Sequence, residues 1–585
     1  MKNTTLLSSS ISLAVPSPRP GPRLPSLFVA IAMLLLLLSI ASSTYADSAT
    51  WKSSPATGDW NTAANWTPMT VPNGPSDTAT FATSNRTAVS LSANTEVNGI
   101  VFNAGASAFT INISPGFELT ISGVGITNNS GSIENFVTAD DGLGHLGIIY
   151  FTNSATVGDL TAFTNRGGTA NLVQGGIIQF FQSSTAGHGT FTNNGGEVAG
   201  ASGGLTEFRD SATAGNGDFT NNGGTIYPTG GGFTIFVGRS TAANGTFTNN
   251  AGMANLLEGG FTVFAEMSSA GNGVFTNNGG RGSGGGVFLQ GTSSAANATL
   301  IAKGSPNGGI RKSGLILFSE HSTGGKARVE VFGEGHLDIS GQDGLGVTVG
   351  SIEGDGLVFL GANNLTVGSN NLTTVFSGKV QDGGAYGGTG GSLTKVGTGK
   401  LVLRLRNTYT GGTIIKRGIL MVNNLGGGSG TGSGPVEVNG GRLGRKGIIA
   451  GAVTVGTGSG QGATLSPGYV HGVGSPGALT IQSALTFNAD ATYKVGLNSS
   501  TASADEVIAN GVTINGAAQF SFNDIGSSML TFGTVFTVIN NTATTPIAGT
   551  FSNLPDGSTF AANGNTYQVN YDGGDGNDLT LTVVP

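Results

Sequence analysis

Nine basic residues between positions 391 and 446 are the side chains of this sequence best suited to contact a ligand. The same stretch holds one acidic residue, Glu437, so it is strongly cationic within a chain of net charge −7. A local excess of positive charge attracts anionic polymers. We therefore expect contact with anionic polysaccharide or cell-envelope glycan, the alternative being that the charges only solubilise outward strand positions. The nine are Lys395, Lys400, Arg404, Arg406, Lys416, Arg417, Arg442, Arg445 and Lys446.

Residues 309–356 are the second candidate, because carboxylates and histidines gather there. The functional hypothesis is a glycan-cleaving cleft or a cation site. The simpler interpretation is a solvated face of strands, since Val329 and Val331 flank Glu330 in an in–out alternation. The residues concerned are Glu320, His321, Arg328, Glu330, Glu334, His336, Asp338, Asp343, Glu353 and Asp355.

Other catalytic and metal-binding patterns are weak. The chain has no Cys, which excludes disulfides, thiolate metal sites and cysteine nucleophiles. Asp572–Asp578 is similar to one calcium-binding nonapeptide turn, but calcium needs stacked copies, so a plain acidic hairpin turn is the alternative. We predict no catalytic residue, cofactor or metal, and exposed turn positions for the five histidines, His145, His188, His321, His336 and His471.

The elements that position these groups are short strands. Gly makes up 103 of 585 residues and charged residues only 10%, which disfavours helices because Gly costs about 1 kcal/mol in a helix interior. Phe-Thr-Asn recurs every 28 residues, and a second aromatic column keeps the same period. A propeller blade needs about 40 residues, so the pattern predicts an all-β parallel β-helix with three strands per coil. The columns are Phe163, Phe191, Phe219, Phe247 and Phe275, and Phe180, Phe208, Phe236 and Phe264.

Identical residues one coil apart should stack about 4.8 Å from one another. We expect Phe inside, the Asn of Phe-Thr-Asn in an amide ladder at the corner, and Thr192, Thr220 and Thr248 facing solvent. The alternation around Phe180 and Phe236 is not clean, which predicts a bulge or corner there.

Within the basic segment, alternation also assigns faces. Leucine is the better core residue, so the expected inward set is Leu401, Leu403, Leu405, Leu420 and Val422. The expected outward set is Arg404, Arg406, Ile419 and Met421, exposed or covered by a loop of the same chain. Apolar groups rimmed by cations are a common surface for association, so self-association is a further expectation.

The segment from Gly391 to Val422, with Asn407-Thr408-Tyr409 and Gly411-Gly412-Thr413, closely resembles the autotransporter-associated β-strand repeat. Trp60–Trp66 is similar to the N-terminal cap of such passenger proteins. The resemblance implies a secreted right-handed β-helix with a pectin-lyase-like architecture and no enzyme. The residues after Leu465 are too few for the outer-membrane barrel of a true autotransporter, so we expect the translocator to be absent.

The first 46 residues predict a secretory signal. Lys2, Arg19 and Arg23 precede the apolar run Leu27 to Ile40, and Thr44-Tyr45-Ala46 fits a cleavage site. The alternative is an uncleaved anchor. Cleavage near Ala46 removes three positive charges and leaves a net charge of −10. The mature chain then has no membrane span, and its negative charge disfavours nucleic acid.

The sequence divides into five predicted parts. These are a signal peptide (1–46), an N-terminal β cap with first coils (47–140), a β-helix of 28-residue repeats (141–390, clearest over 147–291), the basic repeat (391–446), and C-terminal β coils and cap (447–585). The predicted function is a secreted bacterial structural or adhesin-like protein at the surface or in a matrix, associated with the outer membrane. The alternatives are a pectinase-like or lyase-like enzyme acting on polysaccharide, or a passive glycan-binding module.

Overall fold

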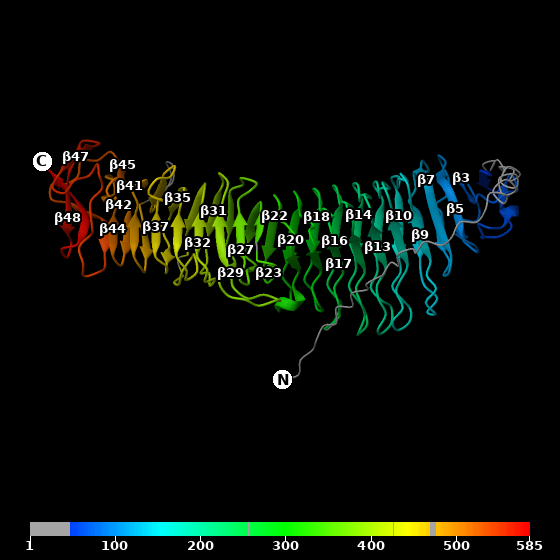
Figure 1. Ribbon diagram of the computed structural model, residues 1–585. Coiled ribbons are helices and arrows are strands. Elements are labelled where there is room, and N and C mark those ends of the chain that lie inside the picture. Colours follow the sequence, from blue (N-terminus) through cyan, green and yellow to red (C-terminus); the bar gives the residue numbers. More distant parts are fainter. Residues whose placement is uncertain (1–46, 256, 345, 425, 469–475) are drawn as a thin grey trace, which may run out of the picture. The chain divides into compact units, whose positions relative to one another are not determined.

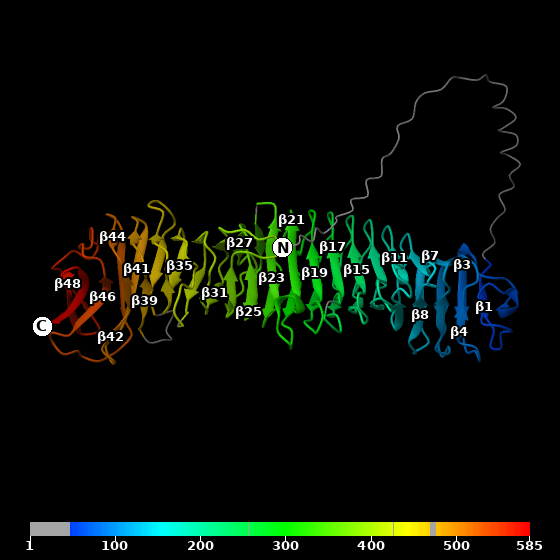
Figure 2. The same cartoon turned by 90° about the horizontal axis from the view of Figure 1, so that it is seen from below.

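The computed structural model describes residues 47–585 apart from 256, 345, 425 and 469–475. The predicted signal and His471 lie outside the described residues. The chain is an all-β solenoid of about 17 turns, and residues from Ala46 onward form one compact unit. Its strands follow one another in chain order along one axis (Figures 1 and 2). In the described part, helical structure is confined to two 3-10 turns, η1 (Ala63–Asn65) and η2 (Ile310–Lys312). None of the described helices has the length and apolar character needed to cross a bilayer.

Four sheets build the solenoid, and most neighbouring strands are parallel. The first sheet contains β2 (Trp66–Thr67), β1 (Ala49–Trp51), β3 (Gly74–Phe81), β5 (Thr95–Phe102), β7 (Glu118–Asn128), β9 (Ile148–Phe151), β11 (Ile177–Phe180), β13 (Leu205–Phe208), β15 (Phe233–Phe236), β17 (Phe261–Phe264), β19 (Gly286–Leu289), β21 (Leu315–Glu320), β23 (His336–Gln342), β26 (Leu357–Phe359) and β29 (Lys379–Gln381).

The second sheet contains β4 (Ala88–Ser90), β6 (Thr110–Ile113), β8 (Glu134–Thr138), β10 (Thr161–Asn165), β12 (Thr190–Asn193), β14 (Asp218–Asn221), β16 (Thr246–Asn249), β18 (Val274–Asn277), β20 (Thr299–Lys303), β22 (Arg328–Phe332), β25 (Ser351–Gly354), β28 (Thr374–Phe376), β31 (Lys400–Leu403), β33 (Ile419–Val422), β35 (Gly441–Gly444), β38 (Ala463–Ser466), β41 (Ala491–Asn498), β42 (Ser503–Ala504) and β45 (Gln519–Asp524).

The third sheet contains β24 (Val347–Val349), β27 (Asn364–Val367), β30 (Ser392–Lys395), β32 (Thr413–Ile415), β34 (Val436–Val438), β37 (Val453–Val455), β40 (Leu485–Phe487) and β44 (Val512–Ile514). The fourth contains β36 (Ile448–Ile449), β39 (Ala478–Ile481), β43 (Glu506–Ala509), β46 (Val535–Asn541), β49 (Asp578–Val584), β48 (Asn565–Gly573) and β47 (Thr559–Ala562), and its last four strands are antiparallel.

The third side of the coil changes along the chain. In the 28-residue repeats it is a single residue per coil, and these residues form a column of isolated bridges that includes Thr185, Thr213 and Thr241. From β24 onward, a strand of the third sheet precedes the second-sheet strand, at the position where each repeat has its bridging residue. The predicted three-strand coil therefore holds for coils such as β23 to β25, while a repeat coil has two strands and one bridging residue. From β32 to β35 the chain alternates between the third and second sheets, with two strands per coil.

The repeat interior consists of two aromatic columns. Phe219 stacks between Phe191 and Phe247 with ring centroids 4.7 Å away on each side, and it meets Phe208 edge-on at 5.7 Å. Every Phe of both predicted columns is buried. Thr192, Thr220 and Thr248 lie on the other face of their strands and are half-exposed, so the predicted in–out assignment is confirmed.

The predicted amide ladder is also present, and it is buried. Asn193 Nδ2 donates to Asn221 Oδ1 at 2.8 Å, and Asn221 Nδ2 donates to Asn249 Oδ1 at 2.8 Å. The three inner rungs, Asn193, Asn221 and Asn249, each have a second donor from the first sheet, as when Thr234 Oγ1 donates to Asn221 Oδ1 at 3.0 Å. Buried amides therefore keep partners in neighbouring coils, which removes the cost of desolvating them.

This bond explains why the alternation near Phe236 is not clean. Thr234 points inward to reach the ladder, so Phe233 and Ile235 point outward, and β15 is apolar on both faces. Of the two expected alternatives, a bulge or a corner, the structure has the corner, marked by positive φ at Gly238. A bulge is absent there, because β13, β15 and β17 pair in unbroken register.

Candidate functional site

Lys395 is not available at the surface. Its side chain is 1% exposed, and its Nζ donates to the carbonyl oxygens of Val396 and Gly397. Burial lowers the pKa of Lys395 to about 8. It lies at the end of β30, where the chain turns toward β31, and we therefore correct its place among the glycan-contact residues.

Four other basic residues gather at the edge where strands of the second sheet begin, and we call them the amino-edge group. Lys400, Ile419 and Arg442 occupy one register column of β31, β33 and β35. Lys416 and Arg417 are exposed in the turn between β32 and β33. Arg442 is half-buried, and burial lowers the pKa of its guanidinium. The group is Lys400, Lys416, Arg417 and Arg442.

The remaining four follow the ends of the same strands, and we call them the carboxyl-edge group. Arg404 and Arg406 are exposed after β31, while Arg445 and Lys446 are half-buried after β35. Arg445 Nη1 donates to the Gly468 carbonyl at 3.4 Å. A strand of four residues separates the two groups, about 10–13 Å at a rise of roughly 3.3 Å per residue. The basic segment is thus two groups of cations with an apolar strip between them.

One of the predicted side-chain directions is wrong. Leu405 is expected in the core, but it is 50% exposed because β31 ends at Leu403 and alternation stops there. Met421 lies on the outward face of β33 as predicted, between Val402 and Gly444, and is covered there, with only 4% of its surface exposed. Leu401, Leu403 and Leu420 are in the core as predicted.

The carboxylates of residues 309–356 hold turns and ion pairs. Arg328 binds Glu353 through two hydrogen bonds of 2.6 and 3.0 Å, which raise the pKa of the guanidinium, and Glu330 lies 3.1 Å from the Arg328 Nε. Glu320, at a positive-φ corner, accepts the Gly291 N–H at 2.6 Å from the preceding coil. The Val329 and Val331 alternation is confirmed, since both are fully buried.

Asp338 is the most constrained of these carboxylates. It is 2% exposed although its strand position faces outward, because the loop 383–388 covers it. One oxygen accepts Ser340 N–H and O–H at 2.8 and 2.6 Å, and the other accepts the Ala385 N–H at 2.7 Å. A carboxylate bonded in this way holds the loop in place, and both of its oxygens are engaged in hydrogen bonds, so neither is available for acid–base catalysis.

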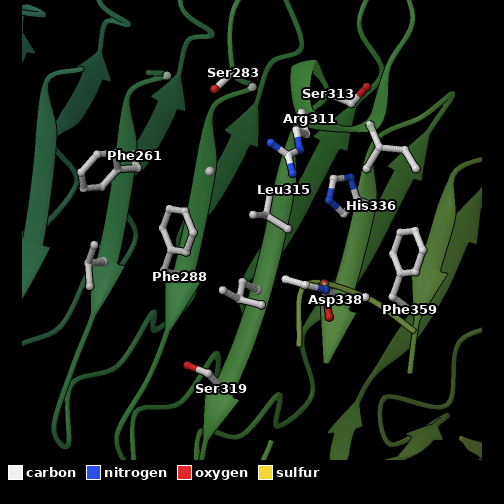
Figure 3. Close-up of a pocket in the computed structure, with 18 of the residues that line it drawn as sticks. Phe261, Ser283, Phe288, Arg311, Ser313, Leu315, Ser319, His336, Asp338 and Phe359 are labelled. Carbon is white, nitrogen blue, oxygen red and sulfur yellow. The ribbon is translucent and has the colours of Figure 1, made fainter. Parts of the chain in front are cut away.

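A groove lies over the outward face of the first sheet at these coils, a feature that sequence reasoning missed. It has a volume of about 1190 Å³ and is lined by side chains from six successive strands, β15 to β26. Figure 3 shows Phe288 and Leu315 on its floor, with Arg311 above Leu315 and His336 beside it on the next strand. Loop 384–386 lines it as well. The sequence feature that could have indicated this groove is the presence of apolar residues on both faces of strands such as Phe233–Phe236.

The floor changes from polar to apolar along the sheet. Gln179 and Glu207 occupy one outward column, and the next coils place Ile235, Val263 and Phe288 there. His336 is 7% exposed, which corrects its expected turn position, and burial lowers the pKa of its imidazole. The groove is therefore apolar at its base and carries polar groups at its rim.

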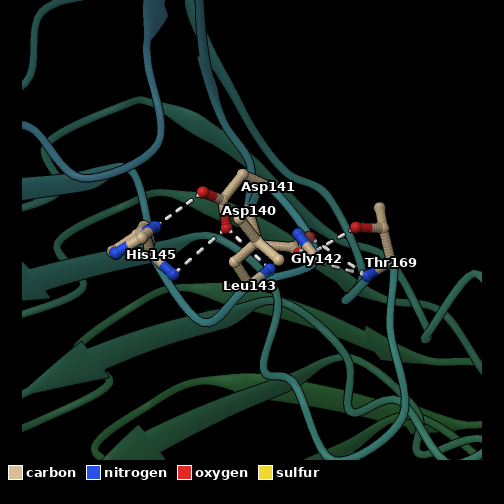
Figure 4. A network of polar contacts seen from close by, with 6 residues as sticks. All are labelled: Asp140, Asp141, Gly142, Leu143, His145 and Thr169. Carbon is tan, nitrogen blue, oxygen red and sulfur yellow. Dashed lines mark hydrogen bonds and ion pairs between the residues drawn. The ribbon is translucent and has the colours of Figure 1, made fainter.

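A second polar network belongs to the loop between β8 and β9 (Figure 4). Asp141 Oδ2 lies 2.6 Å from His145 Nδ1, a bond that lowers the pKa of Asp141. Asp140 accepts the Gly142 N–H at 2.8 Å and the Thr169 hydroxyl at 2.7 Å. These carboxylates close their own loop and bind it to the next coil, so the network is structural.

The acidic turn near the C-terminus joins β48 and β49 as an antiparallel hairpin. Asp578 accepts the Asn541 N–H at 2.9 Å, and burial raises the pKa of its carboxyl. Across the described residues, no three His, Asp or Glu side chains gather closely enough to hold a metal ion. His145, His188 and His321 are exposed as predicted.

Comparison with known proteins finds a family similarity over one short segment of the chain. Residues 393–422 match the model of the passenger-associated-transport-repeat, on the segment whose motif resembles an autotransporter repeat. No curated protein matches the chain. The crystal structure of the Haemophilus influenzae Hap adhesin is similar at a TM-score of 0.27 and 11% identity, over 88% of this chain and 65% of that one, which is under two thirds of its length. The segment of this solenoid from β30 to β33 is therefore similar to the passenger-associated-transport-repeat.

Proposed function

We propose that this protein is a secreted or surface-displayed, adhesin-like solenoid that binds anionic polysaccharide and performs no catalysis. The observation that carries the proposal is the pair of cationic edges around β31, β33 and β35. Export is supported by the leader pattern of residues 1–46 and by the passenger-type repeat. The binding surface consists of the amino-edge and carboxyl-edge groups, without Lys395.

The geometry suits a polymer that lies along the strand direction, from one edge of the second sheet to the other. Arg404 and Arg406 are exposed at one edge, and Lys416 and Arg417 are exposed at the other. A polyanion that spans both edges gains several weak contacts at once, and exposed charges act within about 8 Å at 0.15 M salt. The absence of catalysis is supported by the carboxylates of residues 309–356, which are occupied by turns and ion pairs.

The test is binding of the purified protein to immobilised polygalacturonate, measured by surface plasmon resonance. Reversal of two charges at one edge, Arg404→Glu with Arg406→Glu, should abolish binding and leave the melting temperature unchanged. The matched control, Lys303→Glu with Lys326→Glu, reverses two exposed cations on other coils and should bind like the wild type. Binding should weaken as salt rises.

Two results would contradict the proposal. The first is binding that persists through both the charge reversal and high salt. The second is cleavage of the polysaccharide, measured as new reducing ends, which would favour the alternative of a polysaccharide-acting enzyme.

A further inference from the structure

The groove over the first sheet differs from the cationic edges in its charge. The charged or ionisable side chains that line it are Glu258, Arg311, His336, Asp338 and Tyr386. Glu258 and Arg311 are exposed and opposite in sign, and Asp338 is committed to its own loop. His336 is buried with a lowered pKa, which favours its neutral form. The groove therefore has no cationic excess, and electrostatic complementarity favours an uncharged occupant.

The floor is formed by side chains alone. The strands beneath it, β15 to β26, are all interior members of the first sheet, paired on both sides. A peptide that binds by adding a strand needs an unpaired sheet edge, and the groove offers none. The occupant must instead use apolar contact with the floor and hydrogen bonds with the rim.

One ring on the floor leans over a glycine. Gly286 occupies the register position between Phe261 and Leu315, and a Cβ atom there would lie 2.8 Å from Cε2 of Phe288. The ring of Phe288 thus covers the glycine, and it is perpendicular to Phe261 at a centroid distance of 5.8 Å. The missing side chain at Gly286 makes room for this ring, which forms an apolar platform on the floor.

Hydrogen-bonding groups surround this platform. Arg311 and Ser283 lie at the amino ends of the strands, and Gln290 and Ser319 lie toward the other ends. Six strands at about 4.8 Å spacing give the groove a length of about 24 Å. Apolar and aromatic lining with a few placed polar groups is typical of ligand sites. A linear, uncharged chain with apolar ring faces and many hydroxyl groups matches both surfaces.

We propose that this groove binds a neutral linear polysaccharide, with a sugar ring over Phe288 and hydroxyl groups bonded to the rim. The site is separate from the cationic edges in residues and in ligand charge, and it does not depend on the function proposed above. The protein would then hold two kinds of glycan on different coils.

The test is isothermal titration of the full chain with four neutral hexasaccharides, from cellulose, laminarin, starch and chitin. At least one should bind, with an affinity unchanged between low and high salt. Phe288→Ala should weaken that binding at least about tenfold, as expected for loss of an aromatic anchor. Gly286→Ala should weaken it as well, because the added methyl group displaces the ring.

The control is Phe332→Ala, which removes a 40% exposed Phe of the second sheet and should leave affinity unchanged. Arg311→Ala changes an exposed residue of the rim, so its binding affinity still tests the groove if Phe288→Ala does not fold. The proposal is overturned if no hexasaccharide binds, or if both Phe288→Ala and Arg311→Ala bind like the wild type. It is also overturned if substitution of Arg404 and Arg406 lowers the affinity while substitution of the groove residues does not.

Discussion

The coils between Phe163 and Asn277 and the coils between Leu393 and Leu465 bury their interiors with different side chains. The first set stacks identical Phe rings and bonds identical Asn amides across coils. The second set has a mostly aliphatic interior, apart from Tyr409, and a third sheet in place of the bridging column. The repeats have register-setting side chains that contact their own copies, whereas the later coils have a backbone ladder of the third sheet in place of the bridging column.

The difference also decides what each region can show to solvent. On the second sheet of the repeats, one outward column carries the same residue in successive coils, Thr192, Thr220 and Thr248. On the first sheet of the same repeats, the outward column changes from Glu207 to Ile235 and contributes to the floor of the groove. In the later coils, cations gather at two edges of the second sheet, so each region exposes a chemically distinct surface.

The largest expected effect is on the aromatic column. Phe219→Ala should cost about 3–5 kcal/mol of local stability, because it opens a cavity between two stacked rings. Thr220→Ala, on the half-exposed face of the same strand, should cost less than about 1 kcal/mol. Hydrogen exchange of the coils around residue 219 measures both. Equal losses of stability in the two variants would contradict the assignment of Phe219 to the buried face and Thr220 to the outward face.

The next effect is specific to the later region. Lys395 has a pKa of about 8 in the folded chain against 10.5 for an ordinary lysine. The unfolded chain then binds more protons between these values, so stability should rise with pH from about 8 toward 10.5. The full shift corresponds to about 3 kcal/mol.

Lys395→Met should remove that rise, as measured by urea unfolding of both proteins between pH 7 and 9.5. This window avoids the ionisation of buried tyrosines, whose raised pKa values reduce stability only above about pH 10. A parallel pH dependence of variant and wild type would mean that Lys395 is solvated.

The third effect concerns the two amide columns of the repeats. Asn221→Ala removes a buried rung and leaves its neighbours without partners, which should cost about 1–3 kcal/mol. Asn222→Ala removes a rung of the half-buried outer column, where water can replace the bond to Asn194, and should cost less. Hydrogen exchange of the same coils measures the loss of stability in both variants. A larger loss for Asn222→Ala than for Asn221→Ala would contradict this expectation.

The smallest effect is on the loop that covers Asp338. Asp338→Asn should cost about 1–2 kcal/mol locally, because an amide cannot accept all three donors that the carboxylate holds. Glu330→Gln, in an exposed ion-pair group, is the control and should change little. Proteolysis within residues 383–388 should be faster only in Asp338→Asn, and equal rates would remove Asp338 as the fixing group.

Much of the interior was predictable from the sequence, since Phe163 to Phe275 and the Asn after each Phe-Thr recur at a fixed period. The exposure of Leu405 and the burial of Lys395 and Met421 were not predictable, because alternation says nothing about where a strand ends or what covers its outer face. The groove was missed because the two-faced apolar pattern of β15 looks like irregular alternation until Thr234 is known to bind the amide ladder.

The central claim is that bonded columns of identical side chains hold the repeats together. A double-mutant cycle on the opening free energy of these coils tests it, with Asn193→Ala and Asn221→Ala singly and together. Adjacent rungs of one network should show a coupling of about 0.5–3 kcal/mol, whereas Asn193 with Asn277, three coils apart, should be additive. Additive effects for Asn193 and Asn221 would contradict the claim.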